Sequence, residues 1–507
     1  MITNPSVPVL TSVISSAREA QASWAALSPH QRARKLSGVE RYIADSCDEL
    51  ASVICRDTGK TRVDALATEV VPAALALRYY RRHAGRFLKE ERIACGNLML
   101  FNKKSRLSHQ PYGIVGIISP WNYPFAIPFS EVVMALLAGN AVILKVASAT
   151  PFVGRSIERA LEAAGLPAGL FTYIEMSGKE AVPAFIEASV DKLFFTGSTA
   201  VGKDLMARAA ERLLPVVLEL GGADAAYIRY DADLERAANG ILWAGYSNAG
   251  QSCGGCQRIL VDRRVYESFL DLLSRRVRSL RLGPGASFDS DMGPLISIRQ
   301  KEDVCSLVNE CVRKGARIVA RSEGGSLSPD GSPFMSALVL ADVSPDMPIM
   351  NDEIFGPVVA VLPVDGDEQA LRIANASPYG LTASVWTRDH RTARSLAKKM
   401  QAGAVMINDH LMSHGLAETP WTGFKQSGIG RTHGKSGFME MVRTQVIVDD
   451  ILPGTSRNLW WHPYSERVYN GVKSILAVSF SSSLGERISS LPRLIRFFFR
   501  YWSRSRP

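Results

Sequence analysis

Three side chains of this 507-residue sequence could together carry out acyl chemistry on a carbonyl carbon. Cys253 stands in GQSCGGCQR, Glu219 stands earlier in LELGG, and Asn122 lies in PWNYP. A thiolate can attack a carbonyl carbon, an amide N–H can bind the resulting oxyanion, and a carboxylate can activate water. A single cysteine is more often a buried and inert residue, so the prediction depends on the set of three.

Short apolar segments that alternate with helical ones must position these residues. From Gly113 on, the segments GIVGIIS, NAVILK, KLFF and PVVLEL indicate buried strands. Strands that alternate with helices predict a parallel sheet covered on both faces, and such sheets bind ligands at the carboxyl ends of their strands. Lys145, Gly197 and Glu219 all fall at such ends.

The string FTGSTAVGK places Gly197, Ser198 and Gly202 between a strand and the start of a helix. Glycine lets a backbone approach a phosphate closely, and a helix N-terminus favours an anion. On these grounds alone, an ordinary strand–helix turn explains the string equally well.

The sequence resembles the aldehyde dehydrogenase superfamily over residues 10–450, and the family's motifs occur in the same order along the chain. The resemblance rests on PWNYP, NAVILK, FTGSTAVGK, LELGG, GQSC, EIFGP, NASPYGL and GFKQSGIGR. It implies oxidation of an aldehyde to its acid with NAD or NADP, without transfer to coenzyme A, through a cysteine thiohemiacetal and thioester. The implied roles are nucleophile for Cys253, water-activating base for Glu219 and oxyanion donor for Asn122. No metal is implied, and the implied cofactor contacts are Trp121, Lys145, Ser148, Gly197, Ser198, Gly202, Glu353 and Phe355.

Two departures from the family pattern affect specificity. The usual K-P-x-E continues here as Lys145-Val-Ala-Ser148, so a glutamate that pairs with the ribose of NAD is replaced by serine. A carboxylate would repel a 2′-phosphate and a hydroxyl would not, so we expect NADP to be accepted. Ser130-Glu131 replaces the Trp-Lys of many relatives, so the substrate class cannot be transferred from them. Relatives that acylate coenzyme A commonly lack the glutamate base, so Glu219 favours hydrolysis.

The predicted fold class is α/β, with a Rossmann-like parallel-sheet cofactor domain, an α/β catalytic domain and a small β oligomerisation element. The expected boundaries are 1–91 and 112–221 for the cofactor domain, 222–435 for the catalytic domain, 92–111 and 436–450 for the oligomerisation element, and 451–507 for an extension. The resemblance implies a homodimer or a homotetramer.

Charge and cysteine usage restrict the partners and the compartment. The chain carries a net charge of +10, but residues 451–507 hold eight Arg and one Lys against two Glu. The charge of the remaining residues is therefore nearly balanced, and nucleic-acid binding gains no support.

Seven irregularly spaced cysteines do not suggest a disulfide framework, and we expect a cytoplasmic protein. Cys256 forms a Cys-x-x-Cys pair with Cys253; a zinc site is not expected, and a reversible disulfide stays a hypothesis.

The extension predicts a basic amphipathic helix with Arg493, Arg496 and Arg500 on one face. Its opposite face is expected to carry Leu491, Leu494, Ile495, Phe498 and Trp502. Such a helix suits peripheral contact with an anionic membrane through residues 485–507, and apolar or long-chain aldehydes as substrates. Packing of this helix on the body or on a neighbouring subunit is the alternative. A catalytically silent member that acts as a structural or membrane-associated scaffold is the alternative function.

Overall fold

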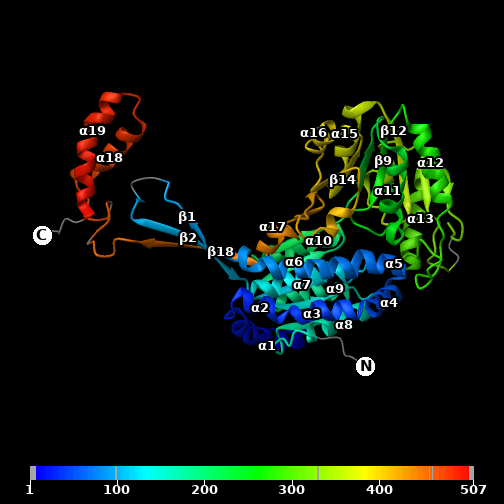
Figure 1. The fold of residues 1–507 in the computed structure, drawn as a ribbon, viewed down its shortest axis with the longest axis horizontal. Helices are drawn as coiled ribbons and strands as arrows, with labels where there is room; N and C mark the ends of the chain where they lie inside the picture. The colour runs from blue at the N-terminus through cyan, green and yellow to red at the C-terminus, as the bar shows by residue number, and fades with distance from the viewer. Residues whose placement is uncertain (1–6, 97–99, 328–330, 456, 460, 502–507) are drawn as a thin grey trace. The chain divides into compact units, whose positions relative to one another are not determined.

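The computed structural model describes residues 7–96, 100–327, 331–455, 457–459 and 461–501. The chain divides into two compact units, Met1–Lys89 with His109–Arg443, and Glu90–Ser108 with Thr444–Pro507. The larger unit contains two parallel-rich sheets, and the smaller one contains a β element and the C-terminal helices (Figure 1).

The first sheet of the larger unit has the strand order β17-β7-β6-β3-β4-β5. Its strands are β3 (Ile114–Ile118), β4 (Ala141–Lys145), β5 (Phe171–Tyr173), β6 (Lys192–Thr196), β7 (Val216–Glu219) and β17 (Gly428–Ile429). All neighbours are parallel except β17, which pairs antiparallel with β7. Parallel strands need helical crossovers, and these cover both faces of the sheet.

The helices that precede and interleave this sheet account for the N-terminal half of the chain. They are α1 (Val7–Ala25), α2 (Pro29–Lys35), α3 (Ser37–Asp45), α4 (Cys47–Thr58), α5 (Arg62–Ala65), the π-helical turn η1 (Leu66–Val70), α6 (Val71–Phe87), α7 (Ala126–Ala138), α8 (Pro151–Glu162), α9 (Gly178–Glu187) and α10 (Thr199–Ala210). Ser28 caps α2 in a capping box with Gln31, which confirms the predicted start of this helix.

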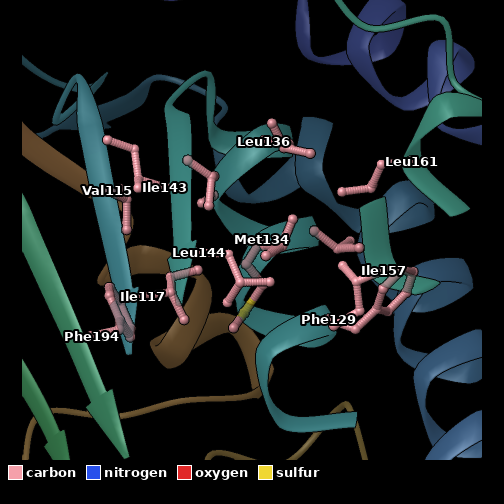
Figure 2. Close-up of a cluster of buried hydrophobic side chains, with 14 of the residues drawn as sticks. Val115, Ile117, Phe129, Met134, Leu136, Ile143, Leu144, Ile157, Leu161 and Phe194 are labelled. Carbon is pink, nitrogen blue, oxygen red and sulfur yellow. The ribbon is translucent and has the colours of Figure 1, made fainter. Parts of the chain in front are cut away.

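The core of the first sheet lies between its central strands and α7. Figure 2 shows Val115 and Ile117 of β3 and Leu144 of β4 in one cluster with Met134 and Phe129 of α7. Every residue of α7 is buried, because the helix lies between the sheet and the N-terminal helices. The residues of β3 and β4 are likewise all buried, as their continuous apolar runs predict.

The second sheet has the order β10-β11-β12-β9-β8-β14-β15 and is parallel except for the edge strand β10. Its strands are β8 (Asp224–Ile228), β9 (Cys256–Asp262), β10 (Arg317–Arg321), β11 (Leu338–Ala341), β12 (Val358–Val364), β14 (Thr382–Trp386) and β15 (Ala404–Ile407). Its helices are α11 (Leu234–Tyr246), α12 (Tyr266–Arg278), α13 (Ile298–Arg313), α14 (Pro348–Asn351), α15 (Gly366–Ala376) and α16 (His390–Ala397). Further short elements of the larger unit are the antiparallel pair of β13 (Tyr379–Gly380) with β16 (Phe424–Lys425), and helix α17 (Gly434–Met439).

The smaller unit begins as the predicted strand pair around a turn. Strands β1 (Glu91–Ile93) and β2 (Lys103–Pro111) pair antiparallel, and β18 (Val442–Asp450) completes a three-stranded sheet in the order β1-β2-β18. Two helices, α18 (Glu466–Phe480) and α19 (Leu484–Phe498), follow with the short 3-10 turn η5 (Phe499–Tyr501).

The structure corrects the predicted amphipathic face of the extension. Leu491 and Ile495 of α19 are exposed, but Leu494 is buried and Phe498 is partly buried. Trp502 lies outside the described residues. The reason is α18, which the sequence analysis did not single out: it packs against α19 and divides its apolar residues between a buried and an exposed stripe. None of the described helices combines the length and apolar character that crossing a membrane requires.

Candidate active site

Cys253 lies where two cavities of the larger unit meet. One cavity, of about 400 Å³, is lined by Asn122, Glu219 and Cys253 together, so the structure brings the three predicted catalytic side chains into one space. The other cavity, of about 280 Å³, reaches Cys253 from the side of Tyr123 and Trp243. A group bound in either cavity can therefore reach the same sulfur atom.

Asn122 is held in place by a buried ion pair whose lysine also contacts the Asn122 loop. Lys60 Nζ lies 2.6 Å from Glu69 Oε1, and both side chains are fully buried. The same Nζ donates to the carbonyl oxygen of Asn122 at 2.8 Å, and Asn248 Nδ2 donates to that carbonyl at 2.9 Å. The backbone of the PWNYP loop is thus fixed from two sides, while the Asn122 side-chain nitrogen donates to none of the described residues and stays available.

The second oxygen of Glu69 fixes the helix that follows this loop. Glu69 Oε2 accepts from the N–H of Phe125 at 2.7 Å and from that of Ala126 at 3.3 Å, where α7 begins. A carboxylate is favourable at a helix N-terminus because it satisfies unpaired N–H groups. Glu69 itself stands on the π-helical turn η1, an irregularity that often marks a functional region.

The turn that precedes Cys253 is conformationally strained. Asn248, Ala249 and Gly250 have φ angles of 53°, 55° and 70°, in the left-handed region that costs about 1–2 kcal/mol per non-glycine residue. Hydrogen bonds hold the turn: the Asn248 N–H donates to Asp64 Oδ2 at 3.1 Å, and its amide donates to Gln251 O at 3.2 Å. This strain is maintained where the backbone must present the sulfur to both cavities.

Glu219 ends β7 in an environment that raises its pKa. Burial raises the pKa well above the ordinary value, and the nearby carboxyl of Glu131 raises it further, whereas the indole of Trp421 lowers it. Neither Glu219 oxygen has a hydrogen-bond partner of normal geometry among the described residues. Burial also raises the pKa of Glu131 to about 8. Glu219, Glu131 and Cys253 line one small cavity together with His414 and His433, so proton exchange among them has a short path.

The thiol of Cys253 is held in its neutral form by its surroundings. Burial raises its pKa, and the carboxyl groups of Glu353, Asp224 and Glu219 raise it further. Cys256 starts β9 as a buried free thiol, and burial raises its pKa as well. Formation of the Cys253 thiolate therefore needs a base, and the carboxyl group of Glu219 lines the same cavity.

The larger cavity has features that fit a dinucleotide. Gly197 and Ser198 stand between β6 and α10, and Ser198 caps α10, so an anion-binding helix N-terminus opens here. The Thr196 hydroxyl is buried without a hydrogen-bond partner among the described residues and faces this end of the strand. A Cβ at Gly221 would lie 2.3 Å from Glu353 Oε2, so a larger residue there would displace the Glu353 carboxylate from this cavity.

Two loops meet on the far wall of this cavity. The rings of Trp121 and Phe355 contact edge to face, with centroids 5.3 Å apart. Phe355 has a φ of 48°, and its carbonyl accepts from Gln300 Nε2 at 3.0 Å. Glu353 Oε1 accepts from the Gly222 N–H at 3.2 Å, which ties this loop to the end of the first sheet.

Three of the predicted cofactor residues are not among those that line the larger cavity. Lys145 ends β4 and is buried, which lowers its pKa. Ser148 follows in the next loop, and its hydroxyl donates to Met176 O at 3.3 Å. Gly202 lies against Leu220, whose side chain would be 2.5 Å from a Cβ at this position, so its place in α10 is explained by packing.

Comparison with known proteins places the chain in a family. The profile of the Aldehyde dehydrogenase family matches residues 8–447. A protein of Mycolicibacterium smegmatis whose assigned name is succinate-semialdehyde dehydrogenase [NADP(+)] is 37% identical over 88% of this chain and 86% of that protein. A 4,4'-diapolycopene aldehyde oxidase of Methylomonas sp is 34% identical over 91% of this chain and 86% of that protein.

Solved structures agree with this assignment. The NAD+ complex of an aldehyde dehydrogenase from Bacillus cereus has a TM-score of 0.83 at 33% identity, over 88% of this chain and 90% of that one. Betaine aldehyde dehydrogenase from Staphylococcus aureus, in complex with NAD+, has a TM-score of 0.84 at 30% identity, over 91% of this chain and 90% of that one. The chain belongs to the aldehyde dehydrogenase family, and the predicted α/β fold and aldehyde oxidation are confirmed.

Sequence reasoning missed several residues that shape this site. Lys60, Glu69 and Asn248 position the loops, and Trp421 and His414 line the apolar cavity. Periodicity gives no signal for a buried lysine, because in sequence it looks like any surface lysine. A signal was present for Glu131, which the sequence singles out: apart from its neighbour Ser130 it stands among apolar residues on its helix, which is unusual for a carboxylate.

We predict that Lys60→Met destabilises the protein more than Lys60→Met combined with Glu69→Gln. The single change leaves an uncompensated buried carboxylate, which costs about 3–5 kcal/mol, and the second change removes that charge. Thermal and denaturant unfolding of both variants measures the difference. Equal stabilities would contradict the buried-charge explanation. We expect turnover to stay low in both, because the Asn122 carbonyl loses one of its two donors.

We predict opposite pH shifts for two neighbours of Glu219. Glu131→Gln removes the charge that raises the Glu219 pKa, so the acidic limb of thioester hydrolysis moves to lower pH. Trp421→Phe removes the indole N–H that lowers this pKa, so the limb moves to higher pH. Single-turnover hydrolysis rates across pH measure both limbs. Shifts in the same direction, or none, would show that another group limits the step.

Proposed function

We propose that this chain oxidises apolar aldehydes to carboxylic acids with NAD or NADP, using Cys253 as nucleophile, Asn122 as oxyanion donor and Glu219 as base. The observation that carries the substrate class is the cavity that reaches Cys253 from the Tyr123 side: none of the described residues that line it is lysine, arginine, aspartate or glutamate. The wall is formed by Ala67, Thr68, Val71, Pro72, Leu75, Tyr123, Trp243, Ser252, Cys253, Gly254, Leu411, Met412, His414, Gly415 and Trp421.

Among the described residues of this wall, His414 and Tyr123 are the ionisable groups besides the nucleophile, and both are neutral at physiological pH. Burial lowers the pKa of His414 to about 4, and burial raises that of Tyr123. Val71, Leu75 and Met412 expose much of their side chains, so apolar surface continues outward from the cavity. Each methylene group that such a wall removes from water contributes about 0.8 kcal/mol.

A carboxylate at the far end of the substrate finds no cation in this wall. The Mycolicibacterium relative is named for succinate semialdehyde, which carries such a carboxylate, and the Methylomonas relative is named for an apolar polyene aldehyde. A buried and unpaired carboxylate is costly, so the wall of this chain favours the second kind of substrate.

The residues support a covalent mechanism in two stages. Glu219 accepts the Cys253 proton as the sulfur attacks the aldehyde carbon, and the new oxyanion accepts from the Asn122 amide and the Cys253 N–H. A nicotinamide cofactor, when bound, would supply the hydride acceptor for oxidation of this cysteine adduct to a thioester. Glu219 releases the first proton to solvent and then takes a proton from water as the water attacks the thioester. The acid leaves, and Glu219 returns this second proton to the sulfur, which restores the thiol.

The cofactor would be held by Trp121, Lys145, Gly197, Ser198, Gly202, Glu353 and Phe355, with Ser148 beside the adenosine ribose. Ser148 places a hydroxyl where a carboxylate would repel a 2′-phosphate, which supports acceptance of NADP. The name of the Mycolicibacterium relative carries NADP(+), and the two solved structures hold NAD+.

We also propose the predicted domain division, a homodimer or homotetramer, and a peripheral membrane contact through residues 485–507. In support of self-association, β18 is exposed along most of its length, including Val446, Ile447 and Val448, and it is an edge strand. Exposed apolar edge strands are ready to pair with another chain. A silent scaffold is the alternative function, and the assembled set of Cys253, Glu219 and Asn122 argues against it.

We predict that purified protein forms NADH or NADPH with saturated aldehydes, and that kcat/KM rises with chain length by up to about 4-fold per methylene. Succinate semialdehyde is expected to fall well below a straight-chain aldehyde with the same number of carbon atoms. Cys253→Ala is the control that should abolish product formation. Turnover that is independent of Cys253, or highest for succinate semialdehyde, would contradict the proposal.

We predict that Ser148→Glu lowers kcat/KM for NADP by about 10- to 100-fold and changes that for NAD little, because the new carboxylate repels only the 2′-phosphate. Initial rates with each cofactor at a saturating aldehyde concentration measure the ratio. Ser148→Ala is the matched control, since it removes the hydroxyl without adding charge. An equal loss for both cofactors in the glutamate variant would place Ser148 away from the ribose.

A further inference from the structure

We propose that the C-terminal hairpin, α18 with α19, seats on the surface of an anionic lipid bilayer through one apolar face shared by both helices. This inference deepens the peripheral contact proposed for residues 485–507, and it does not depend on the aldehyde chemistry. The hairpin face consists of Tyr469, Val472, Leu476, Phe480, Leu484, Ile488, Leu491, Ile495 and Phe499. Their side chains are between 37% and 77% exposed, which is unusual for so many large apolar residues together.

The spacing of these residues makes one stripe on each helix. On α18 they recur every three or four residues from Tyr469 to Phe480, and on α19 from Leu484 to Phe499, which continues into η5. Residues at this spacing share one side of a helix. The buried residues form a separate stripe on each helix, led by Val468 on α18 and by Leu494 and Phe497 on α19.

The two exposed stripes lie on the same side of the hairpin. Successive residues of a helix are rotated by about 100°. On a helical wheel, the centre of the exposed stripe is therefore rotated by roughly 140° from the centre of the buried stripe, and the direction of rotation is the same on both helices. Gly471, near the start of α18, lies against the ring of Phe497, near the end of α19, so the helices run antiparallel. In an antiparallel pair that packs through its buried stripes, equal offsets in the same sense turn both exposed stripes toward the same side of the plane that contains the two helix axes. Figure 1 shows the two helices side by side.

Folding of the smaller unit does not use this face. Its core is made by Leu459, Val468, Phe497 and Tyr501. The Tyr501 hydroxyl donates to Asn102 Oδ1 at 3.0 Å, which anchors the end of the hairpin to the turn between β1 and β2. The exposed stripes therefore remain as free apolar surface after the unit has folded.

Charge indicates which partner covers the face. Residues 451–507 hold nine basic side chains against two acidic ones, so two copies of the hairpin would repel each other and an anionic surface would attract them. Lys473 and Arg496 are exposed, and on the helical wheel they lie about 50° and 100° from the centre of the apolar stripe of their own helix. Neither forms an ion pair among the described residues. Trp461 and Tyr464 add exposed amphipathic rings, which favour the level of lipid headgroups.

The lengths of the helices decide how they would lie. Each has 15 residues, whereas about 20 are needed to cross the hydrocarbon core. Helices with an apolar side and a basic side lie in the plane of the interface. The hairpin thus gives a two-helix platform, in place of the single helix that the sequence predicted.

The test is co-sedimentation of the full-length protein with vesicles of phosphatidylcholine alone or with added phosphatidylserine. We expect about 10-fold tighter binding to the anionic vesicles, and an equal or larger loss in the triple variant Leu476→Ser, Ile488→Ser, Ile495→Ser. Lys473→Glu with Arg496→Glu should remove the preference for phosphatidylserine. The matched controls alter exposed residues of the larger unit: Met206→Ser, Leu213→Ser, Phe288→Ser for the apolar change, and Arg41→Glu with Arg82→Glu for the charge reversal.

Circular dichroism and turnover of a short water-soluble aldehyde check that each variant is folded. Loss of vesicle binding with retained turnover would distinguish this inference from the proposed reaction. Wild-type protein that binds neither vesicle, or a triple variant that binds as wild type does, would overturn the proposal. A triple variant with a smaller assembly in analytical ultracentrifugation would also overturn it, since the hairpin face would then pair with a second copy.

Discussion

The buried ion pair between Lys60 and Glu69 is the interaction on which the geometry of the candidate site depends. Two fully buried charges persist only when they pair and when hydrogen bonds satisfy their remaining groups. Here the remaining groups are the Asn122 carbonyl and the first N–H groups of α7, so the pair couples the N-terminal helices to the loop that carries the proposed oxyanion donor. Because the buried lysine needs the Asn122 carbonyl as an acceptor, the ion pair fixes the position of the Asn122 backbone.

The two cavities that meet at Cys253 differ in their electrostatics. The larger one contains Glu219 and Glu353 and opens at the N-terminus of α10, which suits a polar cofactor with phosphates. The other has no described lysine, arginine or carboxylate in its wall, which suits an apolar substrate. Cys253 lies between them, and neighbouring carboxyl groups with burial keep its thiol neutral until a base removes the proton. The division of charge between the cavities therefore supports the ligand class proposed for each, and Cys253 lines both of them.

The smaller unit follows a different principle, because much of its apolar surface faces outward. Strand β18 is exposed along its length, and both C-terminal helices keep an apolar stripe that their own packing does not cover. A small unit with so much exposed apolar surface stays folded only if other apolar residues form a core. Here Phe497 and Tyr501 form this core with Leu459 and Val468. The exposed surfaces are then consistent with contacts to other molecules, a neighbouring chain for the strand and a lipid surface for the helices.

The sequence by itself determined the strands of the first sheet, the capped start of α2, the strand pair near residue 92 and the residues that gather at the strand ends, because apolar runs and turn residues act locally. It also assigned the family, whose strings it carries in order. Only the tertiary structure decided that Lys60 is buried, that Glu131 lies beside Glu219, and that α18 divides the apolar residues of α19 into two stripes. Each of these depends on contacts between segments far apart in the chain, and the burial of a charge or an apolar side chain is a property of such contacts and not of the local sequence.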